Sequence, residues 1–339
     1  MTERALYRPF LLLLWILLLL AGCEKQTIIH GEISPLREIT SDQLQNIDSV
    51  VLGAGQLYVS DIQSVKVFDL QTGTIISIGE AGTGDGQFTN EVIGLAINSH
   101  DELYAVDQDR PRILVFDRVG TFLREFGVQG RLPGQFMTPQ GIVIDDFDLV
   151  YISDKSRNDV QVFSRGGEFL YGIGQGGSQQ TGLNEPESMA IRDNRLYVAD
   201  EENRRVQMYT LRGEHLGSLP HSGVFGLEGK LGASLDDIPH DTNVEHAFRR
   251  QLSGDLEGLA FDDRGLLYVL DEDDGRILVF QAEVLIGVLS STEPILSGDG
   301  MAFDPELNHL YVVDQGNTRV QVFDVESIHR LLKLAPSHR

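Results

Sequence analysis

A short run of alternating apolar residues that ends in aspartate occurs six times along the chain. The copies are LYVSD (57–61), LYAVD (103–107), VYISD (150–154), LYVAD (196–200), LYVLD (267–271) and LYVVD (310–314). A second apolar-alternating run with an aromatic residue follows each copy, and successive aromatics lie 48, 47, 46, 71 and 43 residues apart. A period of roughly 40–50 residues with about four short strands per unit is typical of a β-propeller blade. The repeat therefore predicts an all-β, six-bladed propeller.

Four strands can be placed in each unit. The first is a short apolar run such as GLAIN (94–98) or GMAFD (300–304), and the aspartate-terminated run and the aromatic run follow it. A turn then leads to a fourth strand, as in GTFLREFG (120–127) and GEFLYGIG (167–174). The uniformly apolar first strand is expected innermost, and the alternating second and third strands are expected to be partly exposed.

The links before the first strands, GQFTNEVIG (86–94) and GQFMTPQG (134–141), resemble those of NHL repeats, as do hairpins in which arginine follows the aspartate by five residues. The resemblance covers about residues 48–323 and implies a six-bladed propeller. The first unit departs from the pattern, with a shorter hairpin and Ser64 at the arginine position, and the third unit has Asp159 there. We assign the propeller to residues 46–339 and a tether with a possible ring-closing strand to 23–45.

A closed ring needs a strand that joins the two ends of the chain, because an open last blade would expose unpaired edges. The candidates are QTIIHGEI (26–33) and HRLLKLA (329–335). The first has the stronger β propensity and is favoured, whereas the second is equally compatible with a short helix.

The six repeated aspartates are interpreted as structural residues. An aspartate at the end of a strand can accept backbone N–H bonds from the following turn, and an arginine five residues later can pair with it. Every blade needs such a turn, whereas catalysis needs one site. The residues are Asp61, Asp107, Asp154, Asp200, Asp271 and Asp314.

The residue before each first strand is expected to face one mouth of the central channel. These residues are Asp48, Ile93, Gln140, Glu187, Glu257 and Asp299. Carboxyl groups gathered in a small space raise one another's pKa or bind a cation, and Ca²⁺ suits an all-oxygen ring. All of them except Ile93 are therefore candidate ligands, and the alternative is a water-filled acidic mouth.

Glu257-Gly258 and Asp299-Gly300-Met301 are similar to metal-binding runs of gluconolactonase-like propellers. That resemblance implies a divalent ion near Glu187, Glu257 and Asp299. The ring positions lack the asparagines that the family also uses, so no metal is assigned.

The fourth and fifth units are separated by an insertion at about 221–252, which contains His221, His240 and His246. The links between blades lie on the mouth side, so the insertion is expected to form a lid or a partner-recognition loop there. The histidine spacings fit no known zinc pattern.

The N-terminus carries two arginines and then an apolar run from Phe10 to Ala21. Its 12 residues would span about 18 Å as a helix, less than the roughly 30 Å of a bilayer core, and the segment is typical of a secretory signal. Leu20-Ala21-Gly22-Cys23 resembles the lipobox of bacterial lipoproteins, which implies cleavage at residue 22 and a lipid on Cys23. Glu24 follows the cysteine, which favours the outer membrane facing the periplasm, or the cell surface.

The formal net charge is −24 at pH 7. So acidic a chain repels phosphate backbones and anionic lipids, which excludes nucleic acid and leaves the lipid on Cys23 as the contact with the membrane. We expect a monomeric, non-catalytic binding module for a protein, peptide or glycan partner in the bacterial cell envelope. The alternative is a divalent-metal-dependent hydrolase or lyase of the lactonase-like type, with Ca²⁺ as the candidate cofactor.

Overall fold

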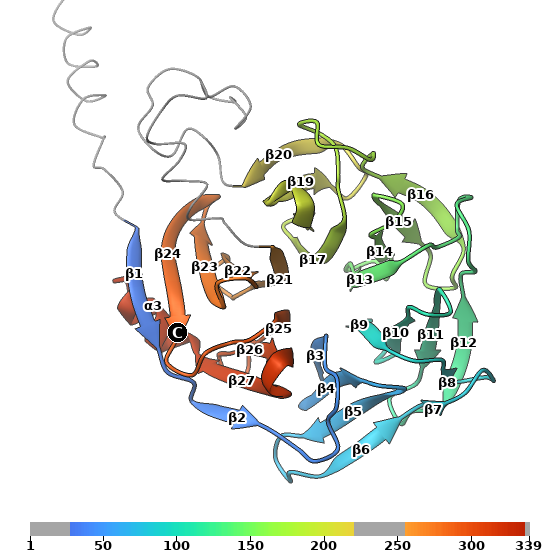
Figure 1. Cartoon of the computed structure of the whole chain (residues 1–339), viewed down its shortest axis with the longest axis horizontal. Helices are drawn as coiled ribbons and strands as arrows, with labels where there is room; N and C mark the ends of the chain where they lie inside the picture. Colours follow the sequence, from blue (N-terminus) through green and yellow to red (C-terminus); the bar gives the residue numbers. More distant parts are fainter. Residues whose placement is uncertain (1–27, 220–254, 336–339) are drawn as a thin grey trace, which may run out of the picture.

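The computed structural model describes residues 28–219 and 255–335. Six sheets surround a central axis, each with its first strand innermost (Figure 1). This arrangement confirms the predicted six-bladed propeller. The insertion predicted at about 221–252 lies outside the described residues.

The first three strands of each blade follow one another in the chain from the axis outward, and in blades 1 to 5 the fourth strand does so as well. Blade 1 contains β3 (Val50–Gly53), β4 (Gln56–Asp61), β5 (Ser64–Asp69) and β6 (Ile75–Ile78), and blade 2 contains β9 (Val92–Ile97), β10 (Leu103–Asp107), β11 (Arg112–Phe116) and β12 (Phe122–Phe126). Blade 3 contains β13 (Pro139–Ile144), β14 (Val150–Asp154), β15 (Asp159–Phe163) and β16 (Phe169–Ile173), and blade 4 contains β17 (Pro186–Arg192), β18 (Arg195–Asp200), β19 (Arg205–Thr210) and β20 (His215–Leu219). Blade 5 contains β21 (Leu256–Phe261), β22 (Leu266–Asp271), β23 (Arg276–Gln281) and β24 (Val284–Ser291), and blade 6 contains β25 (Gly298–Asp304), β26 (His309–Asp314) and β27 (Arg319–Asp324). The short strands β7 (Glu80–Ala81) and β8 (Gln87–Phe88) pair between blades 1 and 2.

Burial along the blade differs from the expectation for the second and third strands. Every residue of β10 and β11 is buried, whereas the outer strand β12 alternates between exposed and half-buried positions. The second and third strands are covered by neighbouring blades on both faces, so their polar positions are buried as well. Gln161 in β15 is fully buried, and its Nε2 donates to the carbonyl oxygen of Gln135 in the preceding link at 2.8 Å.

The apolar core consists of six clusters, each lying between two adjacent blades. One joins blade 1 to blade 2 through residues such as Val67 and Leu114, and another joins blade 6 to blade 1 through Val313 and Val59. The core is therefore a ring, and it is complete only when the first and last blades meet.

The strand that closes the ring comes from the N-terminal part of the chain, at different residues from those expected. β2 (Arg37–Ile39) pairs antiparallel with β27 and supplies the fourth strand of blade 6. β1 (Ile29–Ile33), inside the expected 26–33 segment, instead adds a fifth, parallel strand to the rim of blade 5 (Figure 1). The C-terminal candidate is a helix, α3 (Val325–Leu331), whose first turn is capped by Asp324 accepting from the Ser327 amide at 3.1 Å. None of the helices within the described residues is long and apolar enough to cross a membrane.

The first strands approach one another closely around the axis, and small residues make this possible. A Cβ atom on Gly258 of β21 would lie 2.4 Å from the carbonyl oxygen of Asp299 in β25. The equivalent atom on Gly94 of β9 would lie 2.4 Å from the carbonyl oxygen of Gln140 in β13. Because these neighbours are backbone atoms, they cannot move aside without displacing a strand.

We expect Gly258→Ala to lower the free energy of unfolding by about 1–3 kcal/mol, because the added methyl group overpacks the contact between two blades. Chemical denaturation of both proteins measures the difference. The matched control is Gly172→Ala in the outer strand β16, where an added Cβ meets nothing closer than 3.7 Å and the cost should be small. Equal losses in the two variants would contradict the argument from close approach.

Candidate functional site

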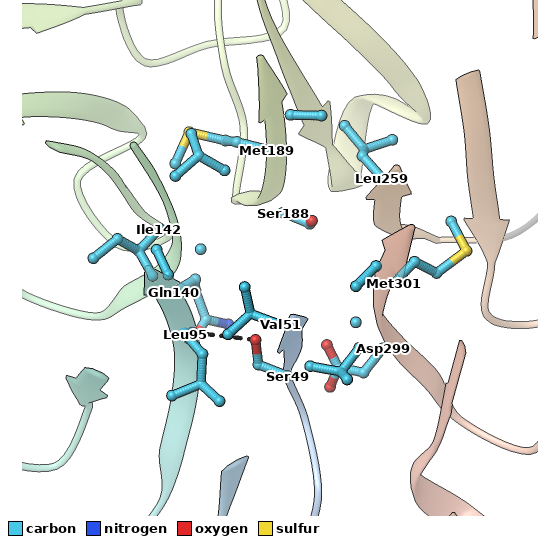
Figure 2. A pocket seen from close by; sticks show the side chains of 18 of the residues that line it. Ser49, Val51, Leu95, Gln140, Ile142, Ser188, Met189, Leu259, Asp299 and Met301 are labelled. Carbon is cyan, nitrogen blue, oxygen red and sulfur yellow. Dashed lines mark hydrogen bonds between the residues drawn. The ribbon is translucent and has the colours of Figure 1, made fainter. Parts of the chain in front are cut away.

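A cavity of about 590 Å³ lies on the propeller axis. Its wall is made by the first strands of all six blades, β3, β9, β13, β17, β21 and β25 (Figure 2). Its mouth is on the side where each first strand begins and each second strand ends. A volume of several hundred Å³ is typical of a small-molecule site.

The six residues expected before the first strands all line this cavity. They form an inner ring, defined as Asp48, Ile93, Gln140, Glu187, Glu257 and Asp299. The side chains of Gln140 and Asp299 lie at the edge of the open centre in Figure 2. The structure thus brings these six positions together around one cavity.

A second set of residues at the mouth was missed from the sequence. This outer ring consists of the residues that follow the six repeated aspartates, Ile62, Gln108, Lys155, Glu201, Glu272 and Gln315. At three blade junctions an outer-ring side chain donates to the inner-ring residue of the next blade. The bonds are Gln108 Nε2 to Gln140 Oε1 (2.5 Å), Lys155 Nζ to Glu187 Oε1 (2.7 Å) and Gln315 Nε2 to Asp48 Oδ1 (2.5 Å). The constant offset from the aspartate is the signal that could have identified this ring.

The carboxyl groups on the blade 4 side of the mouth are paired with a cation. Lys155 Nζ donates to Glu187 at 2.7 Å and to Glu201 Oε2 at 2.6 Å. Gln140 Nε2 also donates to both oxygens of Glu187 at 2.9 and 2.8 Å. Burial opposes the charge of Lys155, but its two carboxylate partners outweigh this and raise its pKa. Lys155 therefore stays charged and compensates this side.

The carboxyl groups of blades 5, 6 and 1 lack such a partner. No N–H donor within the described residues reaches the side chain of Glu257 or Asp299, and Asp48 Oδ2 is buried without a hydrogen bond from any described donor. Burial, followed by neighbouring carboxylates, raises the pKa of both Glu257 and Asp299 well above the ordinary value.

Below the mouth, aliphatic and aromatic side chains contribute to the cavity wall. The part of the first strands that follows the inner ring contributes partly exposed aliphatic and aromatic side chains, including Val51, Ile97, Val143, Ile144, Ile191, Phe261 and Phe303. Figure 2 shows Leu95, Ile142, Met189, Leu259 and Met301 around the same space. The Ser49 hydroxyl in this region already accepts from the Leu95 amide at 3.1 Å. The cavity thus combines an acidic mouth with an apolar interior.

The repeated aspartates lie at the ends of the second strands and are almost fully buried. Four of them pair with the expected arginine, as in Asp200 with Arg205 Nε at 2.7 Å. Their backbone partners, however, lie mainly in the link 15–18 residues upstream rather than in the following turn. Asp154, for example, accepts from the amides of Met137 at 2.7 Å and Thr138 at 3.0 Å. Among the described residues these contacts fix the chain that enters the first strand in every blade except blade 5, where Asp271 Oδ1 has no partner.

The carboxylates that could hold a metal differ from the three suggested by the sequence. Oxygen atoms of Glu187, Glu201 and Glu257 lie within 4.8 Å of one another, so Glu201 takes the place that Asp299 was expected to fill. A second such group is Glu185, Glu201 and Glu202. Lys155 lies 2.6–3.4 Å from oxygens of Glu185, Glu187 and Glu201 and already places a positive charge in both groups.

None of the described residues that line the cavity is a histidine. The three histidines of the insertion, His221, His240 and His246, lie outside the described residues, as does Cys23.

Comparison with solved structures shows the propeller fold. A catalytically inactive virginiamycin B lyase from Staphylococcus aureus with quinupristin matches with a TM-score of 0.56 and 12% identity, over 86% of this chain and 88% of the lyase. A streptogramin B lyase structure matches with a TM-score of 0.56 and 14% identity, over 85% of this chain and 86% of that one. At these identities the similarity establishes the fold alone.

Comparison of sequences gives a shorter match. Protein brain tumor from Drosophila melanogaster is 36% identical over 64 residues, which are 19% of this chain and 6% of that protein. No protein family profile matches the chain.

The mouth carboxyls should make stability depend on pH. Burial is the main reason that the pKa of Asp48 rises to about 6 and that of Glu201 to about 7. The folded protein therefore keeps protons that the unfolded chain releases near pH 4, and stability falls as the pH rises through both values. We expect the thermal midpoint to drop by a few degrees between about pH 5 and pH 8.

Asp48→Asn combined with Glu201→Gln should reduce this dependence, because amides do not titrate. Calorimetry of both proteins across the pH range measures the change. The control is Asp146→Asn, which removes an exposed carboxylate from the opposite end of blade 3. If the thermal midpoint of the double variant changed with pH as much as that of the unchanged protein, the mouth carboxyls would not be the cause of the pH dependence.

Proposed function

We propose that the protein is a lipid-anchored, non-catalytic binding module outside the cytoplasm, and that its acidic mouth takes a positively charged ligand. The observation that carries this proposal is the group Asp48, Glu257 and Asp299, in which one buried and two half-buried carboxyls face a cavity without a basic partner among the described residues. Such a group is costly unless a cation or protons neutralise it. A cationic ligand would supply that charge and gain strong charge-assisted hydrogen bonds.

The anchor rests on the lipobox-like run that ends at Cys23. β1 begins at Ile29, on the outer rim of blade 5 and away from the axis (Figure 1). A tether that enters the propeller at this rim leaves the mouth open to ligands. The six residue-to-residue steps from Cys23 to Ile29 span about 20 Å at most, which would hold the propeller close to the membrane.

We expect the mature protein to begin at Cys23 and to carry acyl chains there, as measured by mass spectrometry and labelled palmitate. Cys23→Ser should incorporate no palmitate and should keep residues 1–22, because the thiol is alkylated before cleavage in lipoproteins. Gly22→Ala keeps a small residue at the cleavage position and should still be acylated. Palmitate on the serine variant would refute the assignment.

A labelled peptide of alternating lysine and alanine is a suitable probe for the charge of the mouth. We expect the unlipidated chain from residue 24 onward to bind it at low salt, and about 1 M salt to abolish binding because charges are then screened within roughly 3 Å. Glu257→Gln with Asp299→Asn should weaken binding about tenfold or more, on the order of 1.4 kcal/mol. Fluorescence anisotropy measures both effects.

The control for this probe is Asp101→Asn with Asp146→Asn, which removes two exposed carboxylates at turns on the opposite face. Binding should be unchanged, because those turns lie at the other ends of the first strands. If both double variants lowered the affinity for the peptide equally, the binding would depend only on the net charge of the protein, and this would contradict a site at the mouth.

A divalent-metal-dependent hydrolase or lyase is the second candidate, favoured by the three close carboxylates of Glu187, Glu201 and Glu257. The presence of Lys155 against two of them argues for the binding function. The two functions differ in their response to chelation. A binding module should keep its thermal midpoint in EDTA, whereas a metal enzyme should lose a stoichiometric ion and melt at a lower temperature.

A further inference from the structure

The carboxyl groups that lack a basic partner among the described residues and the apolar wall belong to one continuous cavity. The inner-ring residues Asp48, Glu257 and Asp299 line it at the mouth, and Val51 and Ile144 line it further along the strands. A ligand that enters the mouth therefore meets carboxyl groups first and hydrocarbon next. A bare metal ion uses the first part only, and a neutral apolar molecule only the second.

The buried oxygen at Asp48 points to a missing partner. Asp48 is 8% exposed, its Oδ1 accepts from Gln315 Nε2 at 2.5 Å, and its Oδ2 receives no bond from any described N–H donor. Asp299 lines the same cavity, but an ionised carboxylate has no hydrogen to donate to Asp48. An ammonium group has several N–H donors and can supply the missing donor while bonding to more than one carboxylate.

The spacing of the carboxyls favours an organic cation over a metal ion. Asp48, Glu257 and Asp299 do not form a group whose oxygens all lie within 4.8 Å, whereas Glu187, Glu201 and Glu257 do. Lys155 lies against Glu187 and Glu201, so the compact group already has a cation. The wider, uncompensated group suits N–H donors that reach outward from a nitrogen centre.

Resting on the proposed function, we propose that the ligand class is a small organic amine with an apolar body. Its ammonium group would bond to Asp48, Glu257 and Asp299 at the mouth, and its apolar body would lie along the first strands toward Ile144 and Phe303. The carboxyls supply orientation and charge recognition, and the wall supplies burial of hydrocarbon, which is the usual division in small-molecule sites.

Calorimetric titration with three probes tests both parts of this proposal on the unlipidated chain from residue 24 onward, which contains all six blades. The probes are n-hexylammonium, methylammonium, which lacks the apolar body, and 1-hexanol, which lacks the charge. We expect n-hexylammonium to bind at least tenfold more tightly than either of the others. Equal binding of 1-hexanol would overturn the role of the carboxyls, and equal binding of methylammonium would overturn the role of the wall.

Two variants locate the ligand. Asp299→Asn should weaken n-hexylammonium at least tenfold, while the distant Asp146→Asn leaves it unchanged. Ala302→Leu adds bulk to the wall in β25, so it should weaken n-hexylammonium and leave methylammonium unaffected. The reverse pattern, with Asp146→Asn as harmful as Asp299→Asn, would overturn the placement.

The lysine peptide separates this inference from the proposed function. Peptide binding that depends on the mouth, together with no binding of n-hexylammonium, would leave the acidic binding module standing and overturn the amine assignment. Failure of both probes would overturn both proposals.

Discussion

The geometry of the mouth depends on the buried carboxylate that ends the second strand of each blade. Asp154 accepts two amides from the link that leads into β13, and Asp200 accepts the Asn184 amide ahead of β17 at 2.6 Å. In five of the six blades, blade 5 being the exception among the described residues, the aspartate therefore ties a hairpin end to the entry of a first strand. The residue after the aspartate and the residue before the first strand are thereby held at the same mouth. An aspartate cannot be exchanged for an apolar residue here without leaving buried amides unpaired.

Each blade depends on its two neighbours, so the local arrangement is complete only when the ring of six blades is closed. Each apolar cluster lies between two blades, so a blade has its core only when both neighbours are present. The last junction depends on β2, which completes blade 6 before the chain enters blade 1. Glycines such as Gly258 let the inner strands approach closely, so the side chains just before them are crowded together. The concentration of carboxyls at the mouth is thus a consequence of how tightly the ring closes.

The repeat allowed the blades and the inner ring to be predicted, because a fixed offset within a repeat becomes a fixed place in a propeller. It did not reveal that Lys155 reaches Glu187 of the next blade, since contacts between blades depend on side-chain direction and not on spacing within one unit. Burial of the second and third strands was underestimated for a related reason. Gln161 looked exposed in an alternating pattern, but a neighbouring blade covers it and its amide finds a partner in the link. The closing strand Arg37–Ile39 has three residues and no apolar alternation, so only pairing with β27 identifies it.

The uneven distribution of charge around the mouth is the strongest physical argument for a ligand. A purely structural ring would be expected to compensate its carboxyls evenly, since uncompensated buried charge lowers stability. Lys155 achieves this next to Glu187 and Glu201, which shows that the fold can accommodate a basic side chain at an outer-ring position. The corresponding outer-ring residue next to Asp299 is Glu272, which adds a further negative charge where a lysine would remove one. Selection for stability alone does not account for that choice, whereas a site that must remain open to a cation does.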